Sequence, residues 1–120
     1  MFDGPGTVAV IDDDAAVLDS LKFLLEVSGH PVAVYPTATA FLQDDRTHPS
    51  CMILDHHMPG MSGLQLVAKL RAGGSDLPVL LITGMPSPAI AAEAQRLGIE
   101  RMLEKPPYED DILKFVAAHQ

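Results

Sequence analysis

Five short apolar runs alternate along the chain with segments of helical spacing, and this alternation limits the fold more than any other feature. The runs are candidate strands and cover residues 7–11, 32–35, 51–54, 78–82 and 101–103. The candidate helices carry apolar residues three or four positions apart and cover residues 15–29, 37–43, 64–70, 90–97 and 110–118. The alternation predicts a doubly wound α/β fold, in which five helices flank both faces of a five-stranded parallel sheet.

The length and composition are those of one globular domain. The chain has 120 residues, of which 48% are hydrophobic, so we expect an ordered chain with a buried core. We expect a single domain over residues 1–120, with residues 1–6 as a flexible N-terminal extension. No apolar run could span a bilayer, and the N-terminus lacks a signal-peptide pattern. Cys51 is the lone cysteine, so it can form no disulfide within the chain, and we expect it to be a small buried hydrophobe. Together these features predict a cytoplasmic protein without membrane contact.

The charge balance restricts the partners. Sixteen acids against eight bases give a net charge of −8. Binding to nucleic acid requires clustered Lys and Arg to neutralise phosphates, so we expect this domain to make no direct contact with nucleic acid. An acidic chain is instead compatible with bound cations.

Polar side chains stand where four of the candidate strands end. Asp12 and Asp13 follow the first strand, Asp55 the third, Thr83 the fourth, and Lys105 comes shortly after the fifth. The carboxyl ends of parallel strands share one edge of the sheet, and ligands bind at that edge in folds of this class. We therefore expect several acids, one hydroxyl and one ammonium group to gather there.

This set of side chains favours a bound cation and phosphoryl chemistry. Clustered carboxylates repel one another, and Mg²⁺, which takes oxygen ligands, would relieve that repulsion. The metal and Lys105 would together neutralise a phosphoryl group, to which Thr83 could donate a hydrogen bond. Asp55 stands alone at its strand end and is the best candidate nucleophile for an aspartyl-phosphate. The paired Asp12 and Asp13 are better placed to hold the metal.

Four short motifs together resemble one known family. They are IDDD at residues 11–14, DHHMPGMSG at 55–63, ITG at 82–84 and EKP at 104–106. In their order and spacing, the chain resembles the receiver domain of bacterial two-component response regulators, in particular the FixJ-type regulators. The resemblance covers essentially the whole chain. It implies the strand order 2-1-3-4-5 and a signalling switch that catalyses only its own phosphotransfer and dephosphorylation.

The resemblance also implies a role for each residue at the sheet edge. Asp55 would accept the phosphoryl group. Asp13 would bind Mg²⁺ directly, Asp12 largely through water, and the backbone carbonyl of His57 would complete the protein ligands. Lys105 would pair with the phosphoryl group. In addition, Thr83 would move toward that group, and the bond between Lys105 and Pro106 would be cis.

The partners follow from the same resemblance. A sensor histidine kinase would supply the phosphoryl group. The output would be a rearranged surface around the fourth helix and fifth strand, which family members often use to form homodimers. An effector domain or a downstream protein would receive the signal.

The chain departs from the family pattern at the switch. Receivers usually carry an aromatic residue three positions before the lysine, where this chain has Met102. A thioether can repack, but it has no ring to move between buried and exposed positions. Pro86 and Pro88 follow Thr83, and we expect them to stiffen the entry to the fourth helix and to remove two backbone donors. The rearrangement of the fourth helix and fifth strand is therefore predicted to be restrained, or to use other contacts than in most receivers.

Two histidines, His56 and His57, follow the acceptor acid directly. They could be solvent-facing loop residues. They could also control dephosphorylation through water or protonation. A third reading is a transition-metal site with Asp55, although adjacent residues rarely point at one metal.

Structural roles are expected for several other residues. Asp14 and Ser62 would cap the helices that follow them, while Phe23, Phe41 and Phe115 would pack in the core or between helices.

Three other functions compete with the signalling switch. A flavodoxin-like cofactor binder would need a phosphate-binding loop where this chain has three aspartates. A small hydrolase with an aspartyl nucleophile would need a cap. A pseudo-receiver would act only by docking to proteins, without phosphorylation.

Overall fold

The computed structural model describes residues 6–45 and 48–120 of the chain. Within these residues, five parallel strands form one sheet in the order β2-β1-β3-β4-β5, which confirms the predicted doubly wound fold. The strands are β1 Val8–Ile11, β2 Val32–Tyr35, β3 Cys51–Asp55, β4 Val79–Thr83 and β5 Arg101–Glu104. The helices are α1 Ala15–Val27, α2 Ala38–Gln43, α3 Gly63–Ala72, α4 Pro88–Arg96 and α5 Glu109–Ala117.

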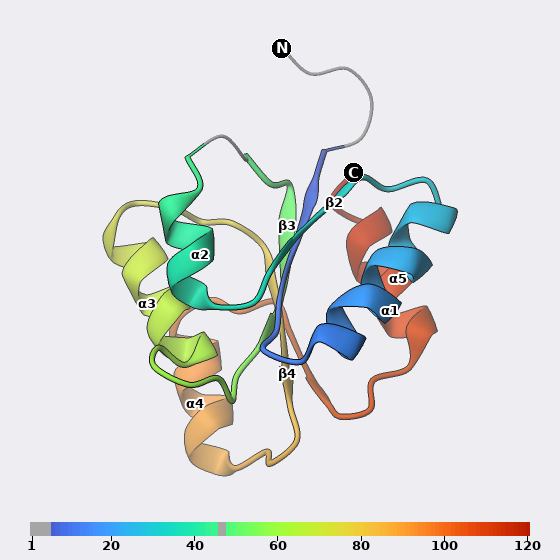
Figure 1. Ribbon diagram of the computed structural model, residues 1–120. Helices are drawn as coiled ribbons and strands as arrows, with labels where there is room; N and C mark the ends of the chain where they lie inside the picture. The colour runs from blue at the N-terminus through green and yellow to red at the C-terminus, as the bar shows by residue number, and fades with distance from the viewer. Residues whose placement is uncertain (1–5, 46–47) are drawn as a thin grey trace.

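Helices cover both faces of the sheet (Figure 1). Helices α1 and α5 lie on one face, and α2, α3 and α4 lie on the other. The buried apolar side chains accordingly form two clusters, one on each side of the sheet. None of the described helices is long and apolar enough to cross a membrane.

Burial differs between the central and the edge strands. Every residue of β1, β3 and β4 is buried, as expected for strands covered on both faces. The edge strands β2 and β5 are more exposed. Strands β3 and β4 extend one residue beyond the predicted limits and include Asp55 and Thr83. Backbone hydrogen bonds from His56 N to Ile82 O and from Lys105 N to Thr83 O, each 2.9 Å long, continue the pairing at this edge.

Side chains cap four of the helices at their N-termini, at α1, α2, α3 and α4. The Asp14 carboxylate accepts a hydrogen bond from Ala16 N–H at the start of α1, as predicted. Ser62 and Gln65 form a reciprocal capping box at the start of α3.

The structure also explains how Pro88 is tolerated at the start of α4. Ser87 caps this helix, and Pro88 occupies its first turn. The backbone N–H groups of a first turn have no partner within the helix, so a proline at this position removes no helical hydrogen bond. The donor that Pro88 removes therefore costs α4 no internal hydrogen bond.

The prediction that Phe23 packs in the core or between helices is wrong. Its side chain is 70% exposed, because helix α1 turns Leu18, Leu21 and Leu25 toward the sheet instead. Phe41 and Phe115 are buried as expected, and so is Cys51. The predicted N-terminal extension falls mostly on residues 1–5, which lie outside the described residues.

Gly63 allows α3 to begin directly against the end of β3. Its N–H donates to the His56 carbonyl over 2.9 Å. A Cβ atom at Gly63 would lie 2.8 Å from the Asp55 carbonyl oxygen and 2.9 Å from both His56 Cα and a Leu81 methyl carbon. Two of these atoms belong to the backbone and cannot yield without moving the strand. The absence of a side chain is thus required for the close approach of α3 to the Asp55 strand.

Replacing Gly63 with Ala is therefore expected to destabilise the fold. We expect the free energy of unfolding in urea to fall by about 1–3 kcal/mol, the usual effect of overpacking. Gly73→Ala is the matched control, since a Cβ there would meet its nearest atoms at 3.6 Å, an ordinary contact. Equal stability of the two variants would contradict the steric argument.

Candidate functional site

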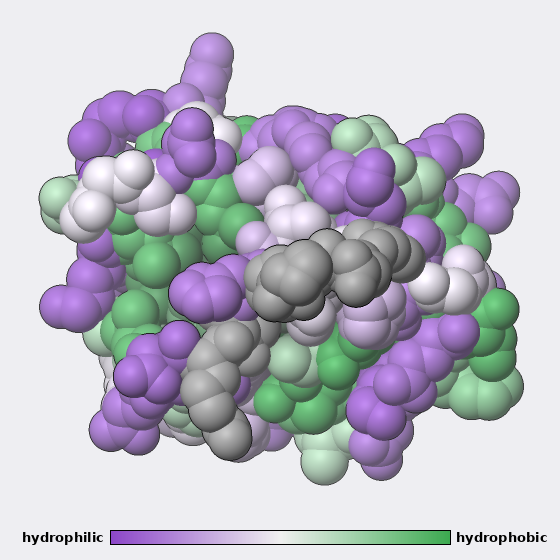
Figure 2. All heavy atoms as spheres, turned by 90° about the horizontal axis from the view of Figure 1, so that it is seen from above, coloured by the Kyte–Doolittle hydropathy of each residue, from purple (hydrophilic) through white to green (hydrophobic). Residues whose placement is uncertain are grey.

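The predicted polar residues gather at the carboxyl edge of the sheet. Asp12 follows β1, Asp55 ends β3, Thr83 ends β4 and Lys105 follows β5. These four strands are consecutive neighbours in the sheet, so the four positions lie in a row. The opposite edge, seen in Figure 2, is a surface of interleaved polar and apolar groups.

Three carboxylates form the centre of the site. Asp12, Asp13 and Asp55 each offer an oxygen, and these oxygens lie within 4.8 Å of one another. Asp12 is 4% exposed and Asp55 is 2% exposed, whereas Asp13 faces solvent. Among the described residues, this is the one group of three or more side chains suited to hold a metal, and it includes no histidine. The geometry thus gives no support to a transition-metal site built on His56 and His57.

Lys105 supplies the positive charge beside these acids. Its Nζ atom lies 2.9 Å from Asp55 Oδ1. The contact is an ion pair by distance, but neither Asp55 carboxylate oxygen has an aligned hydrogen-bond donor among the described residues. A buried carboxylate without donors is unusual, because such oxygens normally accept several hydrogen bonds. Asp55 is therefore held by charge and remains open to a further ligand.

The pKa shifts reflect this crowding. Burial raises the pKa of the Asp12 carboxyl, and the nearby Asp55 carboxylate raises it further, against the hydrogen bond that Asp14 N–H donates to Asp12. Burial lowers the pKa of Lys105, but the surrounding carboxylates, Asp55 above all, outweigh it, so this pKa is raised. Lys105 is therefore firmly protonated at neutral pH.

These acids suit Mg²⁺. The cation takes carboxylate oxygens and keeps several waters. Asp55 contributes buried oxygens without hydrogen-bond donors, and the exposed Asp13 leaves room for water on the solvent side. The donor set and its burial therefore fit the expected cofactor.

Thr83 makes a contact that the sequence did not predict. Its side chain is fully buried, and its Oγ1 atom lies 2.9 Å from His57 Nε2. The hydroxyl also accepts a hydrogen bond from Met85 N–H over 3.1 Å. No motif in the sequence signals this contact, because it depends on the direction taken by an exposed loop side chain.

The structure also describes the second predicted switch residue and the predicted cis-proline. Met102, on β5, is partly buried and packs against the apolar cluster on the α2–α4 side of the sheet. The peptide bond between Lys105 and Pro106 is cis.

His56 and His57 have different environments. His57 is exposed, but His56 is half-buried, and its Nδ1 atom accepts a hydrogen bond from Leu64 N–H over 3.4 Å. The two rings meet edge to face at 4.7 Å. Burial lowers the pKa of His56, and so does the neighbouring His57. The description of both residues as solvent-facing is therefore wrong for His56.

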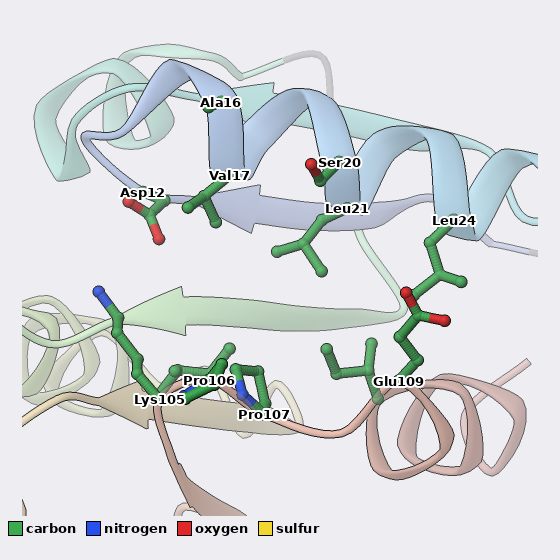
Figure 3. Close-up of a pocket in the computed structure, with 12 residues that line it drawn as sticks. Asp12, Ala16, Val17, Ser20, Leu21, Leu24, Lys105, Pro106, Pro107 and Glu109 are labelled. Carbon is green, nitrogen blue, oxygen red and sulfur yellow. The ribbon is translucent and has the colours of Figure 1, made fainter.

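An apolar groove opens beside the acids (Figure 3). It has a volume of about 360 Å³ and lies between α1 and the chain leading into α5. Val17 and Leu21 line one wall, and Pro106 and Pro107 line the other. Asp12 and Lys105 stand at one end and point toward each other across the groove.

Comparison with known proteins identifies the family. The family model of the response regulator receiver domain matches residues 8–117. The chain belongs to this family. The receiver motifs noted in the sequence thus coincide with the residues that the fold brings to the carboxyl edge of the sheet.

Individual relatives agree with this assignment. The transcriptional regulatory protein FixJ of Azorhizobium caulinodans is 44% identical over 115 residues, covering 92% of this chain and 53% of the relative. FixJ of Bradyrhizobium diazoefficiens is 42% identical over 109 residues, covering 90% and 53%. A CheY-like receiver domain protein of Methanospirillum hungatei superposes with a TM-score of 0.89 at 25% identity, covering 96% and 93%. This receiver domain spans about half the length of the FixJ proteins.

Removing the lysine charge is expected to destabilise the metal-free receiver domain. In Lys105→Met the acids lose their counter-charge, and we expect the free energy of unfolding to fall by about 1–3 kcal/mol. This is less than the loss for a fully buried pair, because the Lys105 side chain is 37% exposed and water screens the charge. The measurement is urea unfolding in the presence of a chelator.

Two further variants control this experiment. Lys69→Met removes an exposed lysine of α3 and should change stability by less than about 0.5 kcal/mol. The cost of Lys105→Met should shrink in the Asp55→Asn background, because the buried charge that it compensates is gone. An unchanged cost in that background would contradict the assigned ion pair.

Proposed function

We propose that this receiver domain is a phosphorylation switch in which Asp55 accepts a phosphoryl group from a histidine kinase. One observation carries the proposal. Asp55 is buried, its oxygens have no aligned hydrogen-bond donor among the described residues, and an ammonium group and two further acids lie next to it. A structural carboxylate would be satisfied by donors, whereas a nucleophile needs a free lone pair.

The transfer is a displacement at phosphorus. An Asp55 oxygen uses a lone pair to form the new bond, while the bond from phosphorus to the donor breaks and the leaving group keeps its electron pair. Lys105 remains beside the incoming phosphoryl oxygens and stabilises their charge. Hydrolysis of the acyl phosphate by water would return the carboxylate, so the domain catalyses only its own phosphotransfer and dephosphorylation.

Asp12, Asp13, Asp55 and the backbone carbonyl of His57 would hold the Mg²⁺ ion. When bound, Mg²⁺ would neutralise phosphoryl oxygens and part of the repulsion among the acids. Of the acids, Asp13 is the one that faces solvent, which supports a role as a direct ligand reached by a hydrated ion.

The switch would run from Thr83 to the surface of α4 and β5. Thr83 would turn its hydroxyl to the phosphoryl group, and the neighbouring loop and Met102 would adjust. The altered surface would then support a homodimer or contact an effector.

The partners and the setting are proposed from the family. We infer a single receiver domain over residues 1–120 that works in the cytoplasm and does not itself contact nucleic acid or membrane. Because the FixJ relatives are about twice as long, an effector domain or a separate downstream protein would carry the output.

Phosphorylation can be tested directly. Incubation with acetyl phosphate and Mg²⁺ should add the mass of one phosphoryl group to the intact protein. Asp55→Asn should add none, since an amide cannot form the acyl phosphate, and omission of Mg²⁺ should suppress the reaction. No gain by the wild type under any condition would favour a pseudo-receiver that acts only by docking.

Binding of Mg²⁺ can be tested without phosphorylation. Saturating Mg²⁺ should raise the midpoint of thermal unfolding, because a ligand that binds only the folded state stabilises it. Asp13→Asn should lose most of this increase. Asp14→Asn is the matched control, since Asn also caps helices and Asp14 is outside the three-acid group. Equal increases in both variants would contradict the assignment of Asp13.

A further inference from the structure

The His57 side chain holds the switch threonine. His57 lies in the loop after β3, and Thr83 ends β4, so the contact joins two segments that both border Asp55. Its length, 2.9 Å, is that of a well-formed hydrogen bond. The end of β3 and the end of β4 are thereby linked through a side chain as well as through the sheet.

This bond satisfies a hydroxyl that has no access to water. Thr83 is fully buried, and its Oγ1 atom already accepts from Met85 N–H. A hydroxyl has one proton and two lone pairs, so it can donate to a neutral Nε2 or accept from a protonated one. His57 is therefore a suitable partner in either ring state.

The hydroxyl is not engaged with the acceptor acid. No aligned hydrogen bond joins Thr83 to either Asp55 oxygen. Under the proposed function, Thr83 turns to a phosphoryl group on Asp55. When Thr83 donates its one hydroxyl proton to Nε2, the same proton cannot go to a phosphoryl oxygen, so the two contacts compete for it.

We propose that His57 is a positioning residue that latches Thr83 in the unphosphorylated arrangement and is released when Thr83 engages the phosphoryl group. This inference rests on the proposed phosphorylation of Asp55. The latch supplies a ring partner for the switch threonine in a chain whose β5 carries the flexible Met102 in place of an aromatic residue. Because His57 is exposed, its freed ring would be hydrated after release.

A double-mutant cycle on binding of a phosphoryl mimic tests the latch. The probe is beryllofluoride at fixed, saturating Mg²⁺, and its dissociation constant is measured by NMR titration. His57→Phe keeps a ring but removes the nitrogen, so binding should tighten about twofold to tenfold, the worth of one net hydrogen bond. Thr83→Val removes the hydroxyl, and in that background His57→Phe should change the constant by less than about twofold.

Two more variants separate the latch from other roles of the ring. His57→Gln retains a side-chain hydrogen-bonding group and should restore an affinity close to that of the wild type. His56→Phe makes the same ring replacement one residue earlier, where the ring contacts α3 rather than Thr83, and should not show the dependence on Thr83. All of these variants keep the backbone carbonyl of residue 57.

A ligand-free readout tests the bond itself. Urea unfolding of the wild type, His57→Phe, Thr83→Val and the double variant should reveal a coupling of about twofold to tenfold in the unfolding constant. Additive effects would overturn the assigned bond.

The two proposals fail in different ways. If the wild type binds beryllofluoride but His57→Phe weakens binding, or acts equally with and without the Thr83 hydroxyl, the latch is wrong and the acceptor site stands. If neither the wild type nor any variant binds beryllofluoride, the proposed phosphorylation is wrong, and a latch against it is wrong as well.

Discussion

The attraction between Asp55 and Lys105 is the interaction on which the carboxyl edge of the sheet depends. Burying one carboxylate costs free energy, and a second buried carboxylate and a third at the surface add to this cost. The ammonium group, 2.9 Å from Asp55, offsets part of it. The carboxylates still outnumber the ammonium group, and this excess of negative charge suits a bound cation.

The fold provides this arrangement through the ends of rigid strands. Asp55 and Thr83 are the last residues of buried strands and are paired to their neighbours by backbone hydrogen bonds. Gly63 brings the start of α3 against the same strand end without a side chain between them. His57, in contrast, lies in the exposed loop beyond the end of β3. The strands thus fix the positions of Asp55 and Thr83, whereas the residues around them come from loops.

The fold and the main site residues could be predicted because they depend on sequence patterns that short segments of the chain display. Apolar runs identify strands, and a parallel sheet necessarily places the residues after them at one edge, so Asp12, Asp55 and Thr83 follow from the pattern. The orientation of single side chains carries no such signal. Phe23 was expected to pack in the core or between helices, but α1 turns Leu18, Leu21 and Leu25 toward the sheet and leaves Phe23 exposed. The contact between His57 and Thr83 depends on a loop conformation that periodicity does not describe.

The row of strand ends has a consequence for the synthesis of the protein. Asp12 emerges from the ribosome early, whereas Lys105 follows the last strand and emerges when most of the chain has been made. Until β5 has joined the sheet, Asp55 lacks the ammonium group that lies beside it in the folded domain. A nascent chain therefore completes the charge pairing at this edge only when its last strand is in place, so the edge is assembled late in folding.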